Sequence, residues 1–249
     1  MSFGVIASLY DRINGELYGP YAEYLKEAIR IHARIPVSDV LDLGCGTGKI
    51  TSLMADAGFN MIGLDSSPDM LNIARENNEG KNTLLLMQDM RSFELYGTVQ
   101  AIYSSFDCLN YIRTSKDLSE IFRLAFNYLD PGGVFLFDVN TSYRMREVYA
   151  DNTFVYELDD EVLYWRCEVS KRAEYCRFIL DRFYDMKPDG TCRYGREIQT
   201  EYSHSRHMLL ALASAAGFLP QAIYGGTDFS VRRMDSEKEY YVFAKPNSL

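Results

Sequence analysis

The chain has 249 residues, of which 47% are hydrophobic and 24% charged, a composition ordinary for a globular protein that excludes disorder as its dominant state. Its 26 lysines and arginines against 35 aspartates and glutamates give a formal charge of −9, which opposes the phosphate-neutralising surface that nucleic-acid binding requires. No apolar run approaches the roughly 20 residues that cross a bilayer, and charged residues interrupt the first thirty positions, so we expect a cytoplasmic protein without a membrane segment or signal peptide.

Residues 1–36 are predicted to form a helical cap, with a helix that runs to about Ile31. The tyrosines that precede or belong to this helix are Tyr10, Tyr18, Tyr21 and Tyr24. For the last two, packing of an amphipathic helix onto the rest of the domain is the preferred interpretation.

From Val40 onward, short apolar runs alternate with helical patterns, as is typical of a parallel sheet covered by helices on both faces. The predicted strands are Asp39–Leu43, Asn60–Asp65, Thr83–Gln88, Val99–Ser104 and Val134–Val139. The predicted helices are Lys49–Ala57, Pro68–Asn77, which Ser66 or Ser67 would cap, and Ser115–Tyr128, where Thr114 and Asp117 have capping-box spacing. A turn at Asp130–Gly133 should precede the fifth strand.

The pattern changes after about Ser142, and residues 142–202 are predicted to form an inserted antiparallel subdomain. Apolar and polar residues alternate there with a period of two, which marks half-exposed strands. In the clearest case Cys192, Tyr194, Ile198, Thr200 and Tyr202 alternate with Arg193, Glu197, Gln199 and Glu201. We expect about three strands, with a turn at Lys187–Gly190 between two of them.

The core is predicted to resume at residue 203, so that residues 37–141 and 203–249 form one domain. A helix over Ser205–Ala216 should end at Gly217, before closing strands at Leu219–Tyr224 and Tyr240–Lys245. The predicted fold class is α/β: a Rossmann-like, mostly parallel seven-stranded sheet with helices on both faces and an inserted antiparallel β lid.

The most informative segment is Val40–Gly48, in which a strand runs into a turn with three glycines and then opens a helix. Glycines let the backbone turn sharply and let a ligand approach the main chain. Asp42 lies on this strand, Asp65 ends the next one, and Asp89 follows the third, so three carboxylates are expected at one edge of the sheet. Buried carboxylates are costly unless something donates to them, and a nucleoside with a diol and an amino group would do so.

The glycine spacing bears on which nucleoside binds. A dinucleotide-binding loop has the pattern G-x-G-x-x-G, whereas this chain has G-x-G-x-G, with Lys49 where the last glycine belongs. Asp42 would also lie awkwardly beside a pyrophosphate. A ligand with a cationic portion is therefore expected.

These residues resemble the class I S-adenosylmethionine-dependent methyltransferases. Asp42–Gly48 is similar to the family's signature loop, Leu64–Leu71 to its ribose-binding segment, and Gln88–Arg91 to its adenine-edge segment. The resemblance is strong over about Asp39–Val139, and within the family the chain looks most like amino-sugar N-methyltransferases and glycine N-methyltransferase. It implies S-adenosyl-L-methionine as the cofactor.

The resemblance also implies roles for individual residues. Backbone at Gly44, Cys45 and Gly46 would face the methionine portion of the cofactor, and Asp42 would contact its amino group. Asp65 with the neighbouring Ser66 would bind the ribose. Asp89 and the Met90 amide would bind the edge of the adenine, and Met70 would pack on the adenine ring. Ser105 and Phe106 would form the outer wall, and Tyr10 and Tyr18 would close the pocket from the amino-terminal side.

A methyl acceptor is expected past the fourth strand, where Asp107 and Asn110 are candidate catalytic residues. Aromatic residues of the inserted segment would enclose the reaction, or pack against the core or a second subunit, so a homodimer is also considered. The expected acceptor is a small molecule with an amine or hydroxyl group.

His204 and His207 have helical i, i+3 spacing but no identifiable third ligand, so solvated histidines rather than a metal site are predicted, with His204 kept as a candidate base. The five cysteines are odd in number and widely spaced, which favours reduced thiols. Two alternatives remain open: a nicotinamide-dependent oxidoreductase, and a non-catalytic protein that binds S-adenosylmethionine.

Overall fold

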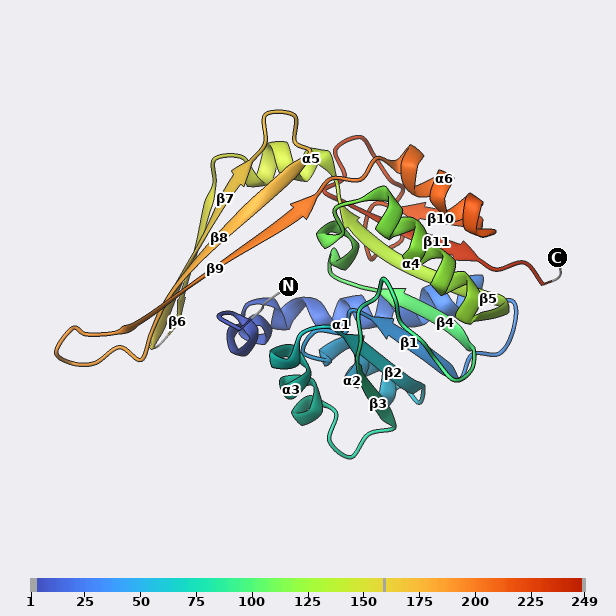
Figure 1. Ribbon diagram of the computed structural model, residues 1–249, viewed down its shortest axis with the longest axis horizontal. Helices are drawn as coiled ribbons and strands as arrows, with labels where there is room; N and C mark the ends of the chain where they lie inside the picture. The colour runs from blue at the N-terminus through green and yellow to red at the C-terminus, as the bar shows by residue number, and fades with distance from the viewer. Residues whose placement is uncertain (1–3, 159, 248–249) are drawn as a thin grey trace.

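The computed structural model describes residues 4–158 and 160–247 (Figure 1). In chain order its elements are α1 (Ala7–His32), β1 (Asp39–Leu43), α2 (Lys49–Asp56), β2 (Asn60–Asp65), α3 (Pro68–Asn77), β3 (Thr83–Met87), β4 (Val99–Ser104), the 3₁₀-helix η1 (Cys108–Tyr111), α4 (Ser115–Tyr128), β5 (Leu129–Asn140), α5 (Ser142–Arg144), the π-helical turn η2 (Met145–Tyr149), β6 (Thr153–Leu158), β7 (Glu161–Val169), β8 (Tyr175–Tyr184), β9 (Arg193–Tyr202), α6 (Arg206–Ala216), β10 (Leu219–Tyr224) and β11 (Lys238–Ala244).

The central sheet, sheet A, has seven strands in the order β10-β11-β5-β4-β1-β2-β3. All neighbours from β5 to β3 pair in parallel, and β11 alone runs against both β5 and β10. The chain builds outward from β1 through β2 and β3 and then returns to place β4 on the other side of β1. The carboxyl ends of β1 and β4 therefore form a switch point, where open α/β sheets bind ligands.

Helices cover both faces of sheet A, as the sequence pattern predicts (Figure 1). On one face Leu41 and Phe135 pack with Phe122 of α4 and Leu209 of α6. Alternate residues of the same strands point to the opposite face, where they pack against α1 and α2. Because both faces are covered, the central strands are continuously apolar.

The predicted helix boundaries are confirmed by their capping contacts. Ser67 caps α3 by accepting a hydrogen bond from the Met70 N–H at 3.4 Å. Thr114 caps α4 by accepting one from the Asp117 N–H at 3.0 Å. Gly217 ends α6 in the left-handed conformation at φ 103°. Two predicted strand starts are wrong. β5 begins at Leu129, ahead of the predicted turn, and its pairing with β4 shifts register between Val99 and Ala101; β11 begins at Lys238, two residues before the predicted start.

The second sheet, sheet B, is antiparallel with the order β6-β7-β8-β9, and it extends to one side of the core (Figure 1). It has four strands rather than the expected three, because Thr153–Leu158 pairs with β7 as a separate strand. The predicted turn at Lys187–Gly190 connects β8 to β9. Within the described residues, no helix is both long and apolar enough to span a membrane.

The alternation in β9 is present in the structure, but its polar side is the buried one. Glu197, Gln199 and Glu201 are buried, whereas Ile198 between them is 56% exposed. A half-exposed strand ordinarily buries its apolar side. Burying polar side chains instead costs desolvation free energy, which hydrogen bonds to these side chains must offset.

Candidate active site

A cavity of about 440 Å³ opens at the switch point of sheet A, beside the glycine turn that follows β1. Its walls come from α1, the loop after β1, the ends of β2 and β3, and the segment after β4. All of the predicted cofactor residues except Asp42 line it: Tyr10, Tyr18, Gly44, Cys45, Gly46, Asp65, Ser66, Met70, Asp89, Met90, Ser105 and Phe106. The segments that the sequence pattern singled out therefore meet around one space.

The glycine turn has a backbone that side chains rarely adopt, with φ of 88° at Gly44, 54° at Gly46 and 70° at Gly48. Gly44 is also required by packing, because a Cβ there would stand 2.2 Å from the Cys108 sulfur. At Gly46 a Cβ would meet nothing within 4 Å, although this residue lines the cavity. Open space beside main chain of this kind can accept a ligand against the backbone.

Asp65, at the end of β2, is fixed by the turn itself. Its Oδ2 accepts a hydrogen bond from the Gly46 N–H at 2.9 Å, and its Oδ1 accepts one from the Ser67 N–H at 2.8 Å. Burial raises the pKa of Asp65, although these backbone N–H groups act against the shift. Each carboxylate oxygen keeps a lone pair for a donor in the cavity, which suits a diol.

Asp42 lies beneath the turn and does not line the cavity. Its Oδ2 accepts hydrogen bonds from Thr51 at 2.5 Å and from Tyr103 at 2.9 Å. Its Oδ1 is buried without a partner among the described residues, and burial raises the pKa of this carboxyl to about 7. An unpartnered oxygen fits a cationic amino group reached directly or through a water molecule.

The adenine-edge prediction concerns Asp89, which stands two residues beyond the end of β3. In the structure its carboxylate is paired with Arg91 at 2.5 Å, and the side-chain hydrogen bonds from Arg91 hold the pKa of Asp89 below its usual value. Asp89 and Met90 face the cavity together with Met70 of α3.

The amino-terminal helix closes the cavity through its tyrosines. Tyr18 donates a hydrogen bond to Asp11 at 2.8 Å, and Thr47 of the glycine turn donates to the same carboxylate at 2.5 Å. Asp11 therefore ties α1 to the turn. Tyr21 points elsewhere, stacking on Phe106 with a centroid distance of 5.0 Å and donating to Asp138.

The segment after β4 forms the wall opposite the glycine turn. Phe106 and Asp107 both have left-handed backbone, with φ of 55° and 56°, which is uncommon for non-glycine residues and concentrates at functional sites. This twist puts Phe106 on the cavity and turns Asp107 away from it, toward the end of β5.

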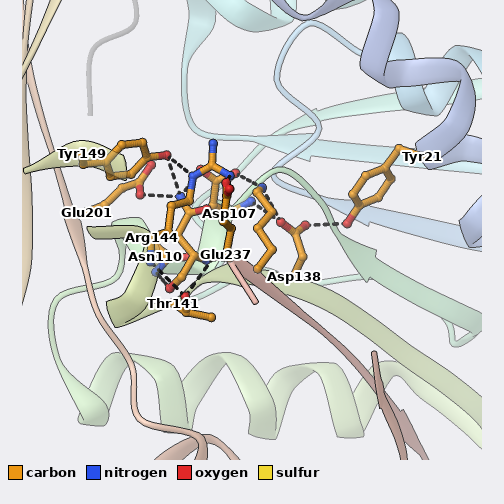
Figure 2. Close-up of polar contacts among 11 residues, drawn as sticks. Tyr21, Asp107, Asn110, Asp138, Thr141, Arg144, Tyr149, Glu201 and Glu237 are labelled. Atoms are coloured by element: carbon orange, nitrogen blue, oxygen red, sulfur yellow. Dashed lines mark hydrogen bonds and ion pairs between the residues drawn. The ribbon is translucent and has the colours of Figure 1, made fainter. Parts of the chain in front are cut away.

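Behind that wall lies a buried polar network (Figure 2). Lys238 of β11 contacts Asp107 at 2.6 Å and Asp138 at 2.8 Å. Burial acts to raise the pKa of Asp107, but the Lys238 ammonium outweighs it and keeps this pKa below its ordinary value. Asn140, at the end of β5, donates to Asp107 at 2.7 Å and to Glu201 of β9 at 2.8 Å, so the network joins the two sheets.

None of the three predicted catalytic residues lines the cavity. Asp107 belongs to the network behind it. Asn110 is fully buried and bridges backbone, donating to the Tyr202 carbonyl at 2.9 Å and accepting from the Asn140 N–H at 2.9 Å. His204 is buried rather than solvated, with Nε2 3.0 Å from the Leu109 carbonyl oxygen, whereas His207 is exposed. The solvated interpretation is therefore wrong for His204, because its ring packs against η1.

Several residues of the site were missed from the sequence. Asp11, Lys238 and Glu201 carry no motif, and their neighbours in space are distant in the chain. Tyr111, which the sequence places beside Asn110 past the fourth strand, does line the cavity. One signal was available for Glu201, since a strand with two acids and a glutamine at alternate positions places polar groups along a single face.

Comparisons with known proteins agree with this geometry. The sequence family described as methyltransferase domain matches residues 40–133. The chain is 36% identical to YqeM of Bacillus subtilis (strain 168), named as a methyltransferase, over 67% of the chain and 66% of that protein. It is 30% identical to another protein named as a methyltransferase, from Geobacillus sp. (strain WCH70), over 67% of the chain and 69% of that relative.

Two further similarities concern the acceptor class and the fold. The chain is 30% identical to the dTDP-3-amino-3,4,6-trideoxy-alpha-D-glucopyranose N,N-dimethyltransferase of Streptomyces venezuelae, over 58% of the chain and 60% of that enzyme. An S-adenosylmethionine-dependent methyltransferase from Clostridium acetobutylicum ATCC 824 has the same fold, with a TM-score of 0.86 at 22% identity, over 98% of this chain and 99% of that one.

Proposed function

Because the chain belongs to the S-adenosylmethionine-dependent methyltransferases, we propose that it methylates a small molecule and that the accepting group is an amine. S-adenosyl-L-methionine supplies a methyl group on a positively charged sulfur, which a nucleophile displaces directly. The protein must then align the acceptor and exclude water.

We propose the cofactor contacts residue by residue. Gly44, Cys45 and Gly46 present backbone to the methionine portion, and this is supported by the open space beside Gly46. Asp42 accepts a hydrogen bond from the amino group of the cofactor, directly or through a water molecule, with its unpartnered Oδ1. In the same assignment Asp65 and Ser66 bind the ribose. Asp89 and Met90 contact the edge of the adenine, and Met70 packs on the adenine ring. Ser105 and Phe106 form the outer wall of the pocket.

The observation that carries the amine assignment is the aromatic wall backed by carboxylates. Tyr10, Tyr18, Phe106 and Tyr111 line the cavity, and aromatic faces favour cations. Behind them, Asp107 and Asp138 share the single ammonium of Lys238, which leaves one negative charge in excess among these three groups. An ammonium or sulfonium is stabilised by such a wall, whereas a phosphate is not. The amino-sugar relative from Streptomyces venezuelae points the same way.

The test is methyl transfer to matched pairs of acceptors that differ only in amine or hydroxyl: glucosamine and glucose, phenethylamine and phenylethanol, ethanolamine and ethylene glycol. Transfer is followed by S-adenosylhomocysteine formation and by the mass of the product. We expect methylated amines. Methylation of the hydroxyl member of each pair alone would contradict the amine assignment.

Asp65→Ala provides the matching negative variant. Losing the ribose contact should weaken S-adenosylmethionine binding by about 1–3 kcal/mol, the scale of a charge-assisted hydrogen bond. Asp69→Asn, at the exposed first turn of α3, is the control that should leave binding unchanged. Equal affinity of the wild type and Asp65→Ala in isothermal titration would remove the ribose assignment.

A further inference from the structure

The inward face of β9 carries three buried polar side chains in a row. Glu197, Gln199 and Glu201 are 8%, 2% and 1% exposed. Burying a carboxylate costs several kcal/mol unless donors or a cation compensate it. The partners of these residues therefore show which of them the fold itself satisfies.

The protein itself supplies hydrogen-bond partners for the first two residues of this row, Glu197 and Gln199. Glu197 accepts hydrogen bonds from the Val5 N–H at 3.0 Å and from Gln199 at 2.6 Å. Gln199 in turn accepts one from the Tyr111 hydroxyl at 3.1 Å. Since Tyr111 lines the cavity, the row of β9 leads to the cavity wall.

Glu201 is compensated less well. Asn140 donates to it at 2.8 Å, but no cation is paired with it among the described residues, because Lys238 is taken by Asp107 and Asp138. Burial and then the charge of Asp107 raise the pKa of Glu201 well above its usual value. Because the Lys238 ammonium favours the ionised form of Asp107, a proton shared by these two acids is favoured on Glu201.

The groups that face Glu201 come from every element around it. Asp107 follows β4, Lys238 is on β11, Tyr111 on η1, Tyr149 on η2, Tyr10 on α1 and Cys176 on β8, and Arg144 of α5 lies beyond Tyr149. The two cations among them are already paired, Lys238 as above and Arg144 with Glu237 at 2.8 Å. A cation that arrived from the cavity would find Glu201 without a competing partner.

A second feature points to the same place. The Oδ1 of Asn140 is buried and accepts no hydrogen bond from any described residue, while the Nδ2 of the same amide contacts both Asp107 and Glu201. A buried acceptor without a donor is uncommon in folded proteins. It lies in the cluster that already has an excess of oxygen acceptors, and the missing component is an N–H donor.

We propose that Glu201 and Asn140 recognise the amino group of the acceptor, with Glu201 as its charge partner and the Asn140 Oδ1 as its second acceptor. This inference rests on the proposed amine methyltransferase function and names the residues that select the amine. When an ammonium binds, Glu201 releases its proton to solvent and pairs with the cation. Before methyl transfer the ammonium passes one proton to the Glu201 carboxylate, so that the neutral amine has a lone pair for the displacement. Glu201 and Asn140 do not line the cavity in this structure, whereas Tyr10 lines it and interacts electrostatically with Glu201, so Tyr10 must turn aside when the acceptor binds.

The decisive variant is Glu201→Gln. A glutamine reproduces the protonated side chain, since it accepts from Asn140 and donates to Asp107, but it cannot ionise. Folding and S-adenosylmethionine affinity should therefore match the wild type. For amine acceptors we expect kcat/KM to fall by at least about 10- to 100-fold, which is the loss expected when one charge-assisted hydrogen bond to the amine is removed.

Titration of the amine into enzyme saturated with S-adenosylhomocysteine gives a readout that a purely structural role would not move. In buffers of different protonation enthalpy, the wild type should release a proton on binding the amine, and Glu201→Gln should release none. Glu168→Gln, an exposed acid of β7 in the same sheet, is the control for removing one charge and should behave like the wild type.

The outcomes separate the two proposals. If the wild type and Glu201→Gln methylate amines equally well, the recognition role of Glu201 is wrong while the amine methyltransferase function stands. Equal losses with amines and with hydroxyl acceptors would also overturn the role, because they would show a general structural effect. If the wild type methylates only the hydroxyl partners, the proposed function itself fails.

Discussion

At the residue scale, the glycine turn contains glycines that are needed for different reasons. Gly44 and Gly48 face side chains at 2.2 and 2.6 Å from an added Cβ, so packing within the protein excludes any other residue. Gly46 has no such neighbour, and apart from its positive φ only a ligand explains why a side chain should be absent.

Gly46→Ala therefore distinguishes the backbone requirement from the ligand requirement. The left-handed backbone should cost about 1–2 kcal/mol of unfolding free energy, while S-adenosylmethionine affinity should fall more than about tenfold, because the new methyl group occupies ligand space. Gly80→Ala is the matched control, since Gly80 also has a positive φ, 73°, and an added Cβ would meet nothing within 4 Å. It should lose similar stability and keep full affinity. Equal affinity of the two variants would show that no ligand approaches Gly46.

Asp42 gives a prediction about pH. Burial raises the pKa of this carboxyl to about 7, whereas in the unfolded chain it titrates near pH 4. The folded state thus binds the proton more tightly, so the stabilisation is complete below about pH 4 and is lost as the pH rises through about 7. Asp42→Asn abolishes the titration.

We expect the unfolding free energy of the cofactor-free wild type to fall by about 1–3 kcal/mol relative to Asp42→Asn between pH 5 and pH 8. Urea unfolding at the two pH values measures this difference. Asp69→Asn, on the exposed start of α3, controls for the loss of one carboxylate. A constant difference between the wild type and Asp42→Asn would mean that Asp42 is ionised at both pH values.

At the scale of elements, α1 is held over the cavity from two sides. Asp11 ties it to the glycine turn, and Glu161 of β7 ties its start to sheet B. Glu161 is buried between Arg12 of α1 and Arg182 of β8, and Arg182 also donates to the Val5 carbonyl at 2.7 Å. Sheet B thereby holds the start of α1, the helix that carries Tyr10 and Tyr18.

Glu161→Gln should lower the unfolding free energy by about 3 kcal/mol, because it leaves a mostly buried arginine without its charge partner. It should also weaken cofactor binding, since α1 is released from one of its anchors. Glu168→Gln removes an exposed pair at 3.7 Å and should change the unfolding free energy by no more than about 0.5 kcal/mol. Chemical unfolding with isothermal titration measures both effects. Similar stabilities for the two variants would contradict the anchoring role.

The same elements show what the sequence could predict. The strands and helices from Asp39 to Tyr128 follow from local apolar periodicity and caps, and they match the structure within a residue or so. β9 was identified as a strand, but the burial of Glu197 and Glu201 conflicts with hydrophobic patterning. Such conflicts arise where function imposes polar groups on a buried surface. The network of Asp107, Lys238 and Asn140 also could not be predicted from the sequence, because it joins residues about 30 to 130 positions apart.

At the scale of the whole molecule, the two sheets have different positions relative to the cavity. Sheet A places the glycine turn and Asp65 at one switch point, and sheet B, which extends to one side of sheet A (Figure 1), contacts the cavity wall indirectly, through the hydrogen bond from Tyr111 to Gln199. The formal charge of −9 suits a protein that binds the sulfonium of S-adenosylmethionine, and it would equally suit the proposed amine acceptor. Cofactor and acceptor would thus meet where the two sheets approach each other.

The most direct measurement is a crystal structure of the protein with S-adenosylhomocysteine bound. We predict the ribose diol on the Asp65 carboxylate, the methionine portion along the backbone of Gly44 to Gly46, and the adenine beside Asp89 and Met90. A nucleoside bound outside this cavity, or a ribose that makes no contact with Asp65, would contradict the proposed cofactor site.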